Sequence, residues 1–125
     1  MSKTLPVVAI FFVSGIAGLA QDTSQYQGWM RSIGPLVGSI RKAPDSAAAK
    51  SDAATLAGIF ARVESFWFSR QADDAVKLSE AALQAARGIA SGSGDNAANL
   101  QRIQDTCGAC HMAHREGSAP NFKIK

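Results

Sequence analysis

A chain of 125 residues has room for one ordinary domain, and too little for a substrate domain beside a separate cofactor domain. Hydrophobic residues make up 46% and charged residues 18%, which excludes both a disordered, charge-rich segment and a polytopic membrane protein. The net charge is +3, and the basic residues are scattered from Arg31 to Lys125, so nucleic acid is not an expected partner.

The first twenty residues have the anatomy of a secretory signal peptide. Lys3 gives a positive start, an apolar stretch follows over 5–17, and small residues lead up to Ala20. We expect a signal peptide at 1–20 and an exported, periplasmic domain at 21–125. The apolar stretch is short for a membrane span, so no span is expected after cleavage. An uncleaved amino-terminal anchor is the alternative.

The next two stretches have helical spacing. The first, about 22–42, places apolar residues at steps of three and four, and therefore on one face. Pro35 is expected to interrupt it. Asp45 is a candidate cap for the second stretch, which runs to about Phe68. The expected inward residues are Tyr26, Met30, Ile33, Val37 and Ile40 on the first stretch, and Leu56, Ile59, Phe60, Val63 and Trp67 on the second.

Two further helices complete the chain. Asp73 is expected to cap a third helix that ends near Ala90, and the Ser- and Gly-rich segment 91–95 is a loop before a fourth helix over 96–115. Gly117 and Pro120 end that helix and leave a tail that should fray. The expected inward residues are Val76, Leu83 and Ala86 or Ala90 on the third helix, and Leu100, Ile103, Cys107, Cys110 and His114 on the fourth. Four helices with short loops predict an all-α antiparallel four-helix bundle.

One motif carries chemistry. Cys107, Cys110 and His111 form C-x-x-C-H, the attachment sequence of a covalent c-type haem. The two thiols add across the vinyl groups at one edge of the porphyrin, which needs sulfurs one helical turn apart. His111 follows at once, so its imidazole is placed to bind the iron. We therefore expect one haem c, with Cys107, Cys110 and His111 as its attachment and metal-binding residues.

Three other readings of the motif remain as alternatives. A zinc site needs four ligands around a tetrahedral metal, whereas the two Cys and two His of this chain all fall within eight residues. A thioredoxin-like dithiol needs a βαβ surround, which the all-helical pattern does not offer. A structural disulfide between Cys107 and Cys110 would close almost no loop and stabilise little.

The position of the motif near the end of the last of four helices makes the chain resemble the class II c-type cytochromes, the group of cytochrome c prime and its low-spin relatives. The segment 26–34, Tyr-Gln-Gly-Trp-Met-Arg-Ser-Ile-Gly, also resembles the first-helix pattern of that family. The resemblance implies an exported bundle in which a first-helix residue lies over the second haem face. Met30 falls on that position. His114 departs from the family, which has an aromatic residue there.

Helix geometry also bears on the second axial ligand of the iron. Such a ligand approaches from the face opposite His111, which excludes Met112, pointing about 100° away around the helix, and His114, on the same side one turn on. Met30 is then the remaining soft or imidazole candidate once the signal is removed. A core methionine that only fills space, a lysine ligand and an empty iron site stay open as alternatives.

These residues predict single-electron transfer between exported redox proteins, with His111 and Met30 on the iron. No nucleophile, general base or substrate cleft is visible, so an enzyme is not expected. The rival is a five-coordinate gas-binding protein like cytochrome c prime, with Met30 unbound. A non-catalytic subunit of an exported dehydrogenase or oxidase is a third reading. Residues 66–68, Phe-Trp-Phe, cannot all face one core, so one of them could mark a homodimer contact.

Overall fold

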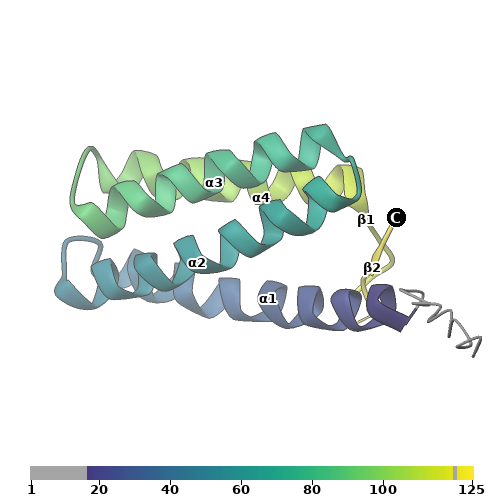
Figure 1. The fold of residues 1–125 in the computed structure, drawn as a ribbon. Coiled ribbons are helices and arrows are strands. Elements are labelled where there is room, and N and C mark those ends of the chain that lie inside the picture. The colour runs from purple at the N-terminus through teal and green to yellow at the C-terminus, as the bar shows by residue number, and fades with distance from the viewer. Residues whose placement is uncertain (1–16, 120) are drawn as a thin grey trace, which may run out of the picture.

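A computed structural model describes residues 17–119 and 121–125 (Figure 1). It confirms the all-α prediction with four helices, α1 (Ala17–Lys42), α2 (Ala47–Ser69), α3 (Asp73–Ser91) and α4 (Asn96–His114). Most of the predicted signal peptide, 1–20, lies outside the described residues. Within the described part, no helix has the length and hydropathy needed to cross a membrane.

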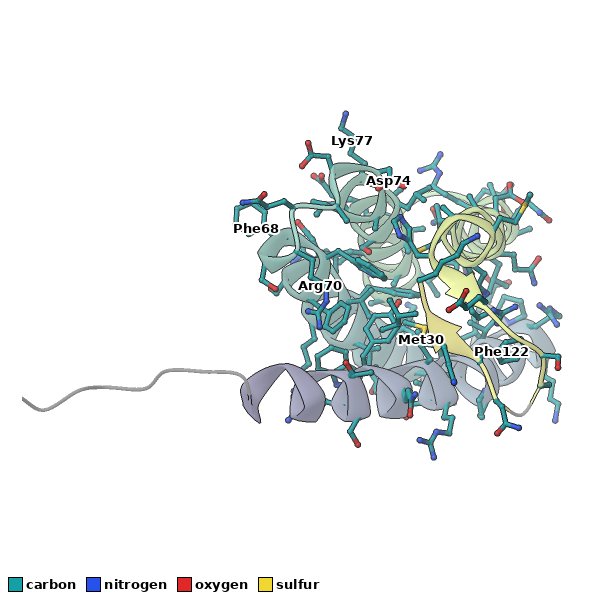
Figure 2. All side chains as sticks on the ribbon, turned by 90° about the vertical axis from the view of Figure 1, so that its right-hand side faces the viewer. Met30, Phe68, Arg70, Asp74, Lys77 and Phe122 are labelled. Carbon is teal, nitrogen blue, oxygen red and sulfur yellow. The ribbon has the colours of Figure 1, made fainter. Side chains whose placement is uncertain are left out.

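The helices pack in chain order. α2 lies against α1 on one side and α3 on the other, and α4 lies against α3 (Figure 1). In the described part, α1 and α4 are not among the closely packed pairs, although they are neighbours when the bundle is viewed from its end (Figure 2). We call this boundary the α1–α4 seam. It is the place in the bundle where two helices approach without packing tightly.

The core takes its largest fully buried side chains from every helix. Ile40, Leu56, Ile89 and Ile103 come from α1, α2, α3 and α4 in turn, and burial of each contributes roughly 1.5–3 kcal/mol. The inward faces expected from the spacing are confirmed. Their members are buried, or half-buried and packed against this core: Tyr26, Met30, Ile33, Val37, Ile40, Leu56, Ile59, Phe60, Val63, Trp67, Val76, Leu83, Ala86, Ala90, Leu100, Ile103, Cys107 and Cys110.

Two predicted helix starts were wrong by one residue. Ser46, not Asp45, caps α2, because its hydroxyl accepts a hydrogen bond from the Ala49 amide at 3.0 Å. Asp73 is the first residue of α3 rather than its cap, and there its carboxylate faces the positive end of the helix dipole. At α4 the cap is Asp95, whose carboxylate accepts hydrogen bonds from the amides of Ala97 and Ala98.

The expected break at Pro35 was also wrong, because α1 continues through that residue to Lys42. A proline inside a helix removes one backbone hydrogen bond, at residue i−4, and packing of the flanking turns can compensate for that loss. The neighbouring residues Ile33 and Ile40 are both buried, so the two halves of α1 are anchored in one core. The turn that carries Met30 therefore remains helical.

The tail does not fray as predicted. It folds back as a hairpin of two short strands, β1 (Arg115–Glu116) and β2 (Lys123–Ile124), paired antiparallel, and both views show it reaching from the end of α4 toward α1 (Figures 1 and 2). The Lys125 amide donates to the His114 carbonyl at 2.9 Å. Ile124 packs against the core, and the Arg115 guanidinium lies 3.9 Å from the centre of the Phe122 ring. These contacts supply the burial that a free tail would lack.

Gly117 makes the hairpin turn possible, which gives a first prediction. Its φ is +89°, and a Cβ there would lie 2.8 Å from the Asn121 carbonyl oxygen. Gly117→Ala should therefore destabilise the hairpin by about 1–2 kcal/mol. Hydrogen exchange of the amides in 121–125 would report faster opening. Gly34→Ala is the control, because that helical position is open to a Cβ and should gain roughly 0.5–1 kcal/mol. Unchanged exchange in Gly117→Ala would contradict the assignment.

Candidate haem site

The motif occupies the last two turns of α4. Cys107 and Cys110 stand one turn apart, and both are half-buried and packed against the core. Gly108 and Ala109, between them, are exposed. Met112 is 83% exposed, which agrees with its exclusion as an axial ligand. The structure thus turns both thiols of the motif toward the interior of the bundle, on one side of one helix.

The two thiols are free and held in the protonated form. Burial raises the pKa of Cys107, and burial together with the nearby Cys107 raises the pKa of Cys110 to about 11. A redox-active dithiol works through a thiolate of lowered pKa, and zinc binding also needs thiolates. The environment of the pair therefore opposes the redox-active dithiol. It suits a neutral thiol that adds to a carbon–carbon double bond.

His111 is half-buried beside the pair. Burial, and then the positive charge of Arg115, lower the pKa of its imidazole below the ordinary value of 6.5. The neutral ring is consequently favoured at physiological pH, and a neutral imidazole nitrogen is the form that binds a metal. Position and protonation state together make His111 fit as an axial ligand.

Met30 lies across the seam from the motif. It rises from α1 toward the interior of the bundle (Figure 2), and it is half-buried against the same core as the two cysteines. The structure therefore places the predicted ligand on the helix that borders α4 without packing tightly against it. Met30 and the two cysteines pack against the same core, Met30 from α1 and the cysteines from α4.

Aromatic rings fill the bundle beside the motif. The helical spacing of these residues in the sequence did not predict which rings contact one another. The Tyr26 and Phe66 rings stack with centroids 4.3 Å apart, and Trp67 packs edge-on to both. The Trp67 indole Nε1–H donates a hydrogen bond of 3.2 Å to the Tyr26 hydroxyl. Phe68, the third residue of the aromatic run, is 75% exposed, as the 100° helical step requires.

His114, which was expected on the inward face of the fourth helix, makes contacts that the sequence did not indicate. Its side chain is only 18% exposed, and its Nε2 lies 2.8 Å from a carboxylate oxygen of Asp74 in the first turn of α3. Its ring also lies 4.6 Å from the Trp67 ring, centroid to centroid. His114 thereby ties the end of α4 to both α2 and α3. His114 and Asp74 lie forty positions apart, so the local sequence does not indicate this contact.

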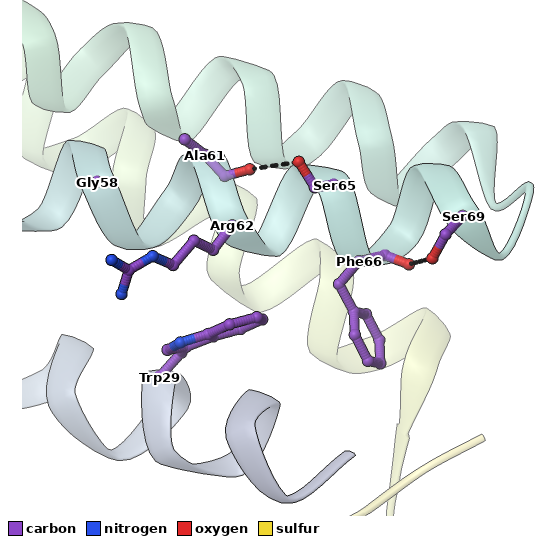
Figure 3. Close-up of a pocket in the computed structure, with 7 residues that line it drawn as sticks. All are labelled: Trp29, Gly58, Ala61, Arg62, Ser65, Phe66 and Ser69. Carbon is purple, nitrogen blue, oxygen red and sulfur yellow. Dashed lines mark hydrogen bonds between the residues drawn. The ribbon is translucent and has the colours of Figure 1, made fainter. Parts of the chain in front are cut away.

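A groove on another face of the bundle is separate from this site. It lies between α1 and α2 and is lined by Trp29, Arg62, Phe66 and small residues of α2 (Figure 3). The Ser65 and Ser69 hydroxyls that border it donate to backbone carbonyls of their own helix. None of Cys107, Cys110, His111 and Met30 lines the groove.

The residues around the seam fit a covalently attached haem. The donor set comprises two neutral thiols one turn apart and a neutral imidazole on α4, with a thioether sulfur on α1. The seam is also bordered by helices that are not tightly packed against each other. No family model, curated protein or solved structure matches the chain, so the assignment depends on these residues.

The pairing of Asp74 with His114 gives a second prediction. The hydrogen bond from His114 is the main cause that lowers the pKa of Asp74 below its usual 3.8. The ionised carboxylate therefore stabilises the fold above about pH 4, and this contribution is lost as the pH falls through the lowered pKa. Asp74→Asn should flatten that acid dependence in urea unfolding measured from pH 6 to pH 2. Asp73→Asn, the neighbouring acidic residue, is the control. Equal flattening in both variants would assign the effect to the helix dipole of α3 instead.

Proposed function

We propose that this protein is an exported mono-haem c-type cytochrome, similar to the low-spin class II cytochromes, that carries single electrons between redox proteins. One observation carries the proposal. The thiols of Cys107 and Cys110 face the core one turn apart, next to His111 and across a loosely packed seam from Met30. A single haem, when bound, supplies the one-electron couple.

Each of these residues would then have a separate role in holding the haem. Cys107 and Cys110 would hold the group on α4 through two thioether bonds. The neutral His111 imidazole and the Met30 sulfur would be the two protein ligands of its iron. A thioether ligand favours the ferrous state and raises the reduction potential relative to two imidazoles. The buried side chains of Tyr26, Phe66 and Trp67 would limit water around the bound group, which acts in the same direction.

The rival function differs in one ligand. If Met30 only packs, the iron keeps an open site on the α1 side, and the protein would bind a diatomic gas such as carbon monoxide or nitric oxide. Met30 is half-buried on the apolar face of α1, where a methionine that only fills space is common. This observation supports the gas-binding function. The interior position of Met30 and its placement across the seam favour ligation.

The third prediction concerns attachment. Coexpression with a haem-ligation system should give a red protein whose colour survives denaturation and acid extraction, because thioether bonds do not reverse under those conditions. Cys107→Ala combined with Cys110→Ala should abolish the covalent link, and His111→Ala should keep the link but lose the proximal ligand. Met112→Ala, at the exposed methionine beside the motif, is the matched control and should attach haem normally. Haem that extracts freely from the unmodified protein would refute the proposal.

The fourth prediction concerns Met30 and separates the two functions. A His–Met iron should be low-spin in both oxidation states, and the ferric form should show the weak far-red band of a sulfur-to-iron transition. Met30→Ala should remove that band, convert the iron to high spin and accelerate carbon monoxide binding. Met112→Ala should change none of these spectra. A high-spin spectrum in the unmodified protein would instead place the gas-binding function first.

A further inference from the structure

The Tyr26 hydroxyl donates its proton to no acceptor among the residues that the structure describes. An indole N–H can only donate, so in the 3.2 Å bond with Trp67 the Tyr26 oxygen is the acceptor. The phenol proton must therefore go elsewhere, and in the described residues no side-chain or backbone acceptor receives it. Tyr26 is only 7% exposed. Buried hydroxyls normally both donate and accept, so this donor is available to a partner outside the described residues.

The surroundings of Tyr26 limit where that partner can lie. On the α2 side, the Phe66 and Trp67 rings cover Tyr26, and Trp29 packs against its edge within α1. None of these three side chains has a hydrogen-bond acceptor of ordinary strength. The phenol also lies close enough to Cys110 and Cys107 for both thiols to affect its ionisation. A partner for the proton would thus come from the side of the motif.

The protonation state of Tyr26 supports a donor role. Burial, followed by the nearby Cys110, raises the pKa of the phenol to about 12. The hydroxyl therefore keeps its proton throughout the physiological range. Tyr26 also stands four residues before Met30 on the same face of α1, one helical turn away. The Tyr26 hydroxyl and the proposed ligand Met30 therefore lie on the same side of the seam, on α1.

We propose that Tyr26 is a binding residue, whose hydroxyl donates a hydrogen bond to an oxygen atom of the group attached to Cys107 and Cys110. This inference rests on the proposed function, and it adds a recognition contact that no motif indicates. A haem offers oxygen acceptors in the carboxylates of its propionate groups and, under the rival function in which Met30 does not bind the iron, in an oxygen-bearing molecule bound there. Trp67 is the positioning residue, because its bond occupies the phenol oxygen and directs the remaining proton.

The fifth prediction tests this donor with Tyr26→Phe, which removes the hydroxyl and keeps the ring that stacks on Phe66. Circular dichroism of the variant should show an unchanged helical fold. Resonance Raman spectra of the haem-loaded ferric protein report hydrogen bonding to the propionates through their carboxylate bending band. The stretching frequency of carbon monoxide, measured in a Met30→Ala background where the iron is open, reports a donor to a molecule on the iron.

The two spectra distinguish the two possible acceptors of the Tyr26 proton. A shift of the carboxylate band to lower frequency in Tyr26→Phe supports the propionate as acceptor, and a higher carbon monoxide frequency supports the iron-bound molecule. Trp29→Phe is the control, because it changes a ring that packs against Tyr26 and keeps both the phenol and its bond to Trp67. The same shifts in that variant, or no shift in Tyr26→Phe, would overturn the donor role. Absence of covalent haem in the unmodified protein would overturn the proposed function itself, which is a distinguishable result.

Discussion

The buried indole of Trp67 makes the contacts that hold together the end of the bundle where the C-x-x-C-H motif lies. Its Nε1–H bonds to Tyr26 of α1, its ring packs on His114 of α4, and Phe66 lies edge-on beside it. Aromatic pairs of this kind contribute about 0.5–1.5 kcal/mol each beyond the area that they bury. One side chain of α2 therefore fixes the distance between two helices that do not pack tightly on each other.

That indirect support explains how the bundle can be stable although α1 and α4 are not among its closely packed pairs. The far part of the bundle is held by aliphatic packing, with Ile40, Leu56, Ile89 and Ile103 fully buried. At the motif end, α4 is tied to α3 by His114 and Asp74, and the carboxyl-terminal hairpin reaches toward α1. None of these contacts uses the thiols of Cys107 and Cys110, which are free for the proposed haem.

Helix period and capping chemistry account for the parts of the fold that the sequence predicted well. A step of 3.6 residues determines which side chains share a face, so the inward stripe from Tyr26 to Ile40 followed from spacing alone. Gly92 at φ +70° and the Asp95 cap likewise make the third loop recognisable. The helix starts at Ser46 and Asp73 were each misjudged by one residue. At α2 the neighbouring Ser46 has the capping role predicted for Asp45, and at α3 the residue before the helix is Ala72, which makes no side-chain cap.

The sequence by itself determined the helices, the spacing of the thiols and the proximity of His111 to them, since all of these are local properties of one helix. Only the tertiary structure decided the rest. It paired His114 with Asp74, gave the Tyr26 oxygen to Trp67, and folded the tail into a hairpin. These contacts join residues of different elements, many of them forty or more positions apart. Their partners are selected by how the packed helices face one another, which no local pattern of residues encodes.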